Sequence, residues 1–145
     1  MPLTKIPVAN AHAVADGVWA GGQPTPEQFA EMAAAGLHTV INLRPEREIP
    51  WDERATVAQL GMEYLNLPVA GAGDLTPAAA RQLHEALGTS RKPVLVHCGS
   101  SNRVGALFAL KSKWVDGQDT ATALANGRAA GLKDLEPAVR AMLTP

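Results

Sequence analysis

Residues 94–105 read Val-Leu-Val-His-Cys-Gly-Ser-Ser-Asn-Arg-Val-Gly and contain the single cysteine of the chain, Cys98. The apolar run at 94–96 predicts a buried strand, and the apolar spacing that follows Asn102 predicts a helix. A small polar loop joins the two. Backbone N–H groups at a helix start lack internal partners, and the helix dipole is positive there. The loop is therefore expected to bind an anion.

The residue types in this loop suggest covalent catalysis on an anionic group. The positive field of the helix start, together with Arg103, favours the thiolate form of Cys98, which is the nucleophilic form. Arg103 offers a planar pair of donors that suits a tetrahedral oxyanion. His97 either promotes the thiolate or braces the loop by bonding to nearby backbone, and bracing is favoured. The remaining oxyanion donors are expected to be the backbone amides of Gly99, Ser100, Ser101 and Asn102.

A lone cysteine after an apolar strand is commonly just a small buried hydrophobic residue. The neighbours of Cys98 argue against that interpretation. Small polar residues such as Gly99 contribute nothing to a core strand, but they let backbone amides approach a ligand closely. A cation at the start of a helix, such as Arg103, opposes the helix dipole unless an anion lies beside it.

Outward from this stretch, short apolar runs alternate with helical patterns, which predicts an α/β domain with a short, mainly parallel sheet flanked by helices. Strands are expected at 17–20, 39–43, 62–67 and 94–96. Helices are expected after the Thr25 capping box, at 51–60, after Thr76, and at 102–115, 119–130 and 134–143. Asp119 and Asp134 are the expected caps of the last two. Crossover helices would bring the cysteine loop to the carboxyl ends of the strands.

The composition limits the classes of function. The chain has 145 residues and a net charge of −1, which predicts one domain over 1–145 and no affinity for nucleic acid. No apolar run approaches the roughly 20 residues of a membrane helix, and the first ten residues lack a secretory core. We therefore expect no membrane partner, and the single cysteine favours a cytoplasmic location. His12, His38 and His84 lack metal-ligand spacing, so neither a metal nor another cofactor is expected. The oligomeric state is left open.

The order His97, Cys98, short loop, Arg103 and helix resembles the signature of the protein-tyrosine and dual-specificity phosphatase superfamily. More closely, the chain resembles the small bacterial phosphatase-like family also found fused to β-lactamase-like hydrolases. The resemblance covers residues 15–133, with a last helix that runs to 143. It rests on Gly-Gln-Pro-Thr at 22–25, Thr-Val-Ile-Asn-Leu-Arg at 39–44, Leu-Pro-Val at 67–69 and the block 97–105. It implies the dual-specificity phosphatase fold.

The resemblance also implies a mechanism without a cofactor. The cysteine attacks phosphorus to form a phosphocysteine, and an aspartate of a neighbouring loop protonates the leaving oxygen. The matching loop here precedes the helix at Thr76, and Asp74 is its acid, with Glu46 and Glu48 as alternatives. Arg44, at a strand end, either adds positive charge for the substrate or is a solvated residue. The expected partner is a phosphorylated small molecule or a phosphoprotein.

Departures from the pattern keep two other functions open. Four residues separate Cys98 from Arg103, where typical phosphatase loops have five, although the small bacterial family shares the shorter loop. Ser101 stands where that family often has glycine, and Val104 stands where a Ser or Thr commonly helps the thiolate leave. A gap of four is also the loop length of rhodanese-type sulfurtransferases, which implies a Cys98 persulfide and a sulfane-sulfur donor. The third possibility is an oxyanion-binding module without turnover.

Overall fold

The structure is a computed structural model that describes residues 6–144. A five-stranded sheet with the order β1-β2-β5-β3-β4 forms its centre. β1 pairs with β2 in antiparallel fashion, and the other neighbouring pairs are parallel, which confirms the mainly parallel sheet. The strands are β1 (His12–Ala15), β2 (Val18–Gly21), β3 (Thr39–Asn42), β4 (Glu63–Asn66) and β5 (Val94–His97).

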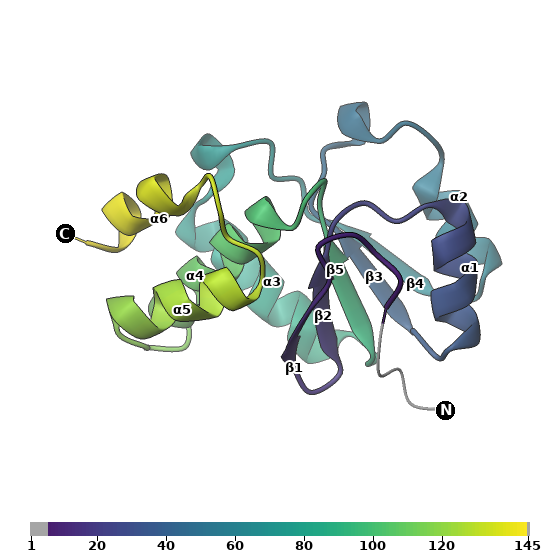
Figure 1. Ribbon diagram of the computed structural model, residues 1–145, viewed down its shortest axis with the longest axis horizontal. Helices are drawn as coiled ribbons and strands as arrows, with labels where there is room; N and C mark the ends of the chain where they lie inside the picture. The colour runs from purple at the N-terminus through teal and green to yellow at the C-terminus, as the bar shows by residue number, and fades with distance from the viewer. Residues whose placement is uncertain (1–5, 145) are drawn as a thin grey trace.

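Helices cover both faces of this sheet. Figure 1 shows α1 and α2 on one side and α3 to α6 on the other. This is the α/β arrangement that the alternating pattern predicts. The helices are α1 (Pro26–Ala34), α2 (Glu53–Gln59), α3 (Pro77–Thr89), α4 (Asn102–Trp114), α5 (Thr120–Ala129) and α6 (Glu136–Leu143), with short 3-10 turns η1 (Glu46–Glu48) and η2 (Ala72–Asp74).

Most of the local signals act as expected. Thr25 and Gln28 form the capping box of α1, and Asp119 accepts a hydrogen bond from the backbone of Thr122 to cap α5. The prediction that Asp134 caps the last helix is wrong: α6 begins at Glu136 without a side-chain cap. A residue of α4 fixes the turn that precedes α6. Asn102 Oδ1 accepts hydrogen bonds from the backbone N–H groups of Lys133 and Leu135.

β1 lies before the first strand predicted from the sequence and was not expected. Its side chains alternate between exposed and half-buried positions, so it carries no buried apolar run. Gly17 has a φ of +71° in the turn that joins β1 to β2, a backbone conformation that glycine adopts without strain. The short strand therefore owes its existence to pairing with β2 rather than to a strong pattern of its own.

β5 lies between β2 and β3 and is buried along its whole length. Successive side chains of a strand point to opposite faces. Val94 and Val96 accordingly join the core under α3 to α6, and Leu95 joins the core under α1 and α2. Side chains of β5 thus pack into the core on both faces of the sheet, which fixes the position of the strand and of its carboxyl end. The residue that follows its last position is Cys98.

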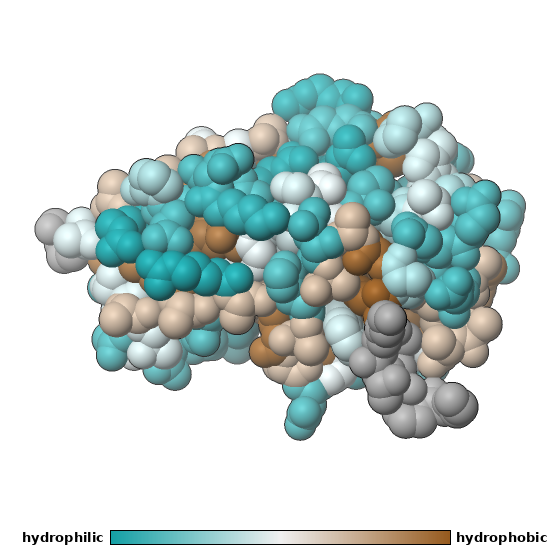
Figure 2. Space-filling view, in the orientation of Figure 1, coloured by the Kyte–Doolittle hydropathy of each residue, from teal (hydrophilic) through white to brown (hydrophobic). Residues whose placement is uncertain are grey.

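The face seen in Figure 2 is mostly hydrophilic, with apolar residues in small separate patches. Among the residues described, Leu65 is the one large hydrophobic side chain classed as exposed. Over the same part of the chain, no helix has the length and apolar character needed to cross a bilayer.

Candidate active site

The cysteine loop lies at the carboxyl edge of the sheet, supported from below by the segment after β2. The Cys98 N–H donates to the Gly21 carbonyl at 3.2 Å, and the Gln23 N–H donates to the Gly99 carbonyl at 3.2 Å. A Cβ atom on Gly22 would lie 2.8 Å from the Gly99 oxygen, so only glycine permits this approach. Cys98 is buried, whereas Gly99 and Ser100 are exposed. The thiol is therefore buried, and the two residues that follow it in the loop are exposed to solvent.

The side chains of Ser101 and Asn102 anchor the loop to the connection between α5 and α6. Ser101, which stands where the family often has glycine, has a φ of +73° in the left-handed region and precedes α4. It is fully buried, and its hydroxyl donates to the Ala130 carbonyl at 2.6 Å. Asn102 Oδ1 accepts the Lys133 N–H at 2.8 Å. Both side chains thus fix the backbone of the loop, and their amides remain the expected oxyanion donors.

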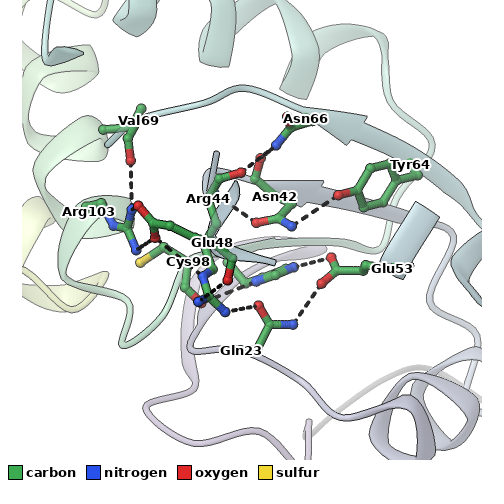
Figure 3. A network of polar contacts seen from close by, with 11 residues as sticks. Gln23, Asn42, Arg44, Glu48, Glu53, Tyr64, Asn66, Val69, Cys98 and Arg103 are labelled. Atoms are coloured by element: carbon green, nitrogen blue, oxygen red, sulfur yellow. Dashed lines mark hydrogen bonds and ion pairs between the residues drawn. The ribbon is translucent and has the colours of Figure 1, made fainter. Parts of the chain in front are cut away.

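Arg103 is held over the loop by two elements that lie far from it in sequence. Its Nη1 donates to the Val69 carbonyl at 2.8 Å and to Glu48 Oε2 at 3.2 Å. Its Nη2 lies 3.0 Å from Glu48 Oε1 and 3.6 Å from the position of a Cβ on Gly99. Figure 3 shows Cys98 on the side of the loop where Arg103 and Glu48 meet. The Nε edge of the guanidinium takes no part in these contacts.

Glu48 acts here as a partner of arginine rather than as an acid. Its hydrogen bond with Arg103 lowers the pKa of the Glu48 carboxyl below its ordinary value, although desolvation opposes the shift. An ionised carboxylate cannot donate a proton to a leaving group. The geometry therefore argues against Glu48 as the general acid.

Arg44 joins the same network from the end of β3. Its Nη1 donates to Gln23 Oε1 at 2.7 Å and its Nη2 donates to the Glu48 carbonyl at 2.6 Å, with 19% of the side chain exposed. Arg44 is therefore not a freely solvated charge. Its guanidinium fixes the Glu48 segment, and a contact with substrate remains a prediction.

Polar side chains of β3 and β4 hold this segment in turn. Asn42 Oδ1 accepts the Arg44 N–H, and its Nδ2 donates to the Tyr64 hydroxyl at 3.1 Å. Asn66 Nδ2 donates to the carbonyls of Asn42 and Arg44. Burial raises the pKa of Tyr64, so its hydroxyl keeps its proton at neutral pH. The Arg44 end of the network is thus fixed to the sheet (Figure 3).

His97 is buried beneath the loop and makes two contacts. Its Nδ1 lies 3.3 Å from the Cys98 carbonyl oxygen, and its Nε2 lies 2.6 Å from Glu53 Oε2. The first contact is of the bracing kind expected for this residue. The second contact is with Glu53, which was not predicted as a site residue. In the sequence it is an ordinary acidic residue in the first turn of a helix.

The comparisons with known proteins agree with this architecture. The family model described as "Beta-lactamase hydrolase-like protein, phosphatase-like domain" matches residues 10–115. The chain belongs to this family. A β-lactamase hydrolase-like protein of Xylella fastidiosa is 37% identical over 102 residues, which is 67% of this chain and 23% of that protein. The chain thus spans about a quarter of the length of this curated relative.

Solved structures share the fold of this phosphatase-like domain. A candidate phosphatase from Neisseria meningitidis superposes with a TM-score of 0.76 at 22% identity, covering 92% of this chain and 95% of that one. TpbA of P. aeruginosa was solved as a cysteine-to-serine variant in complex with pTyr. It superposes with a TM-score of 0.65 at 23% identity, covering 91% of this chain and 81% of that one. The family match assigns the chain to a phosphatase-like domain and lends no support to the sulfurtransferase alternative.

Asp74 lies in the loop where the family resemblance predicts the general acid. It ends η2, is exposed, and its Oδ2 accepts the Ala70 N–H at 2.8 Å. The neighbouring Val69 carbonyl is the acceptor of Arg103. This loop and the arginine are therefore tied together, and the role of Asp74 remains a prediction. Among residues 6–144, no three His, Cys, Asp or Glu side chains gather as metal ligands would.

Proposed function

We propose that this phosphatase-like domain hydrolyses phosphate monoesters through a phosphocysteine at Cys98. The observation that carries the proposal is Arg103, held by Glu48 and the Val69 carbonyl above the loop that begins at Cys98. A guanidinium fixed at that position neutralises the charge of a transferring phosphoryl group without having to reorganise.

In the first step the Cys98 thiolate attacks phosphorus. The S–P bond forms, the P–O bond to the leaving group breaks, and Asp74 gives its proton to the leaving oxygen. In the second step a water gives its proton to Asp74 and its oxygen attacks phosphorus, so that the S–P bond breaks and inorganic phosphate leaves. Arg103 and the amides of 99–102 hold the phosphoryl oxygens in both steps.

The substrate is proposed to be a phosphorylated small molecule or a phosphoprotein. The complex of TpbA, a structure of the same fold, with pTyr makes an aryl phosphate a sensible first probe. Incubation with p-nitrophenyl phosphate should release phosphate, and intact mass should reveal a phosphoryl adduct at short times. Cys98→Ser should abolish both. Asp74→Asn should slow release while the adduct still forms from this substrate, because p-nitrophenolate leaves without needing a proton.

Two other outcomes would replace this proposal. Gain of one sulfur atom from thiosulfate, without phosphate release, would assign the loop to sulfur transfer. Binding of phosphate to both the unmodified chain and Cys98→Ser, with turnover of neither donor, would assign it to a binding module.

A further inference from the structure

A buried contact between His97 and Glu53 lies directly beneath the cysteine loop, and the proposed mechanism does not use it. The side chains of His97 and Glu53 have no exposed surface, and Nε2 lies 2.6 Å from Oε2. Burying a carboxylate is costly unless it is paired and hydrogen-bonded. Glu53 meets both conditions, since its Oε1 is bonded to Gln23 Nε2 at 2.7 Å.

The orientation of Gln23 fixes the donor and acceptor roles in this contact. Arg44 has only donors, and its Nη1 lies 2.7 Å from Gln23 Oε1, so that atom must be the amide oxygen. The amide nitrogen therefore faces Glu53 and also the Pro24 carbonyl at 3.0 Å. Glu53 Oε1 consequently accepts a hydrogen bond, as a carboxylate oxygen does.

The ring of His97 lies between two oxygen atoms. The Cys98 carbonyl can only accept, so Nδ1, at 3.3 Å, carries a hydrogen. Nε2 faces Glu53 Oε2 at 2.6 Å, so both ring nitrogens of His97 lie against oxygen atoms. A ring with a hydrogen on each nitrogen would satisfy both contacts, and that form is an imidazolium next to Cys98 in the chain. The other titratable or charged groups linked to this pair are Arg44, Glu48, Arg54, Tyr64 and Arg103.

We propose that Glu53 is a positioning residue for Cys98: its carboxylate keeps His97 cationic, and this cation stabilises the Cys98 thiolate while its Nδ1–H fixes the Cys98 carbonyl. The inference builds on the proposed role of Cys98 as nucleophile. Glu53 acts on Cys98 through His97, and its other oxygen holds Gln23, whose backbone N–H donates to the Gly99 carbonyl of the loop.

The variant Glu53→Gln removes the charge of the Glu53 carboxylate and keeps the size and hydrogen bonds of the side chain. A glutamine at this position can still accept from Gln23 and can donate to His97 Nε2, so both hydrogen bonds survive. That donation requires Nε2 to accept, which makes the imidazole neutral. Glu85→Gln, which removes an exposed carboxylate from α3, is the matched control.

The readout is the ultraviolet absorbance of the thiolate as a function of pH. The chain has one cysteine, so the signal reports Cys98 alone. Glu53→Gln should raise the pH midpoint by about one unit, which is tenfold less thiolate at any pH below the midpoint. Glu85→Gln should leave it unchanged. A folded Glu53→Gln protein with the midpoint of the unmodified chain would overturn the proposal.

A second measurement needs no variant of Glu53. Nitrogen NMR of the unmodified protein should find both ring nitrogens of His97 protonated at neutral pH. His97 is the one fully buried histidine, since His12 is half-buried and His38 and His84 are exposed. A neutral tautomer would contradict the proposal. Neither measurement uses a phosphate ester, so failure of this inference is distinguishable from failure of the proposed function.

Discussion

Alanine should have opposite effects at two helical glycines, Gly105 in α4 and Gly88 in α3. A Cβ on Gly105 would lie 2.1 Å from the Leu132 nitrogen and 2.7 Å from the Gly127 oxygen, both of them backbone atoms. A Cβ on Gly88 would meet nothing within 4 Å. Both positions are within helices and neither has a positive φ, so the substitution has the same intrinsic benefit at both.

The magnitude follows from these distances. Exchanging glycine for alanine in a helix gains about 1 kcal/mol of intrinsic propensity, which should appear in full for Gly88→Ala. At Gly105 the Leu132 backbone must move by about 1.3 Å to reach an ordinary contact of 3.4 Å. Overpacking costs about 1–3 kcal/mol, and a backbone shift of this size places the cost near the upper end. After the gain of about 1 kcal/mol in helix propensity, Gly105→Ala should be less stable than the unmodified chain by about 2 kcal/mol.

Thermal unfolding followed by circular dichroism is the assay. For a domain of this size, about 1 kcal/mol shifts Tm by roughly 2–4 °C. Gly88→Ala should therefore raise Tm by about 3 °C, and Gly105→Ala should lower it by about 6 °C. If Gly105→Ala melted at or above the temperature of the unmodified chain, the close packing between α4 and the turn after α5 would be refuted.

The remaining predictions concern three site residues. Ser101→Ala loses the buried hydrogen bond to the Ala130 carbonyl and keeps the positive φ, so urea unfolding should find it less stable than the unmodified chain by about 1–2 kcal/mol. Ser101→Gly loses the same hydrogen bond but relieves about 1 kcal/mol of backbone strain, so it should be more stable than Ser101→Ala. Glu48 has a pKa lowered by Arg103, so its contribution to stability is present above its unfolded value of about 4.5 and is lost as the pH falls through the folded value. Melts from pH 7 to 3 should find the stability difference between Glu48→Gln and the unmodified chain shrinking with acid, and a constant difference would contradict the ion pair. Asp74→Asn should lower kcat for an alkyl phosphate, a poor leaving group, by about 10²–10⁴-fold, and equal kcat values would exclude Asp74 as the acid.

Much of the fold is readable from local chemistry. Capping residues such as Thr25 and Asp119 act through hydrogen bonds to residues three positions on, so the sequence alone marks where their helices begin. The apolar run of β5 is equally local. The predictions were wrong where contacts with another element determine the local structure. β1 forms by pairing with β2, and the turn before α6 is fixed by Asn102 of α4.

The candidate site likewise has a part that the sequence predicts and a part that depends on the tertiary structure. Residues 97–103 are contiguous, so their spacing alone determines that a thiol, a run of small residues and an arginine meet at a helix start. The partners of those residues are decided only by the tertiary structure. Glu48 and Val69 reach Arg103 from other loops, and Glu53 reaches His97 across 44 positions of the chain. Each is an ordinary residue in its own segment, because a charge pair formed between distant elements leaves no periodic or spacing signal. Parallel strands that end at one edge of the sheet bring these partners together.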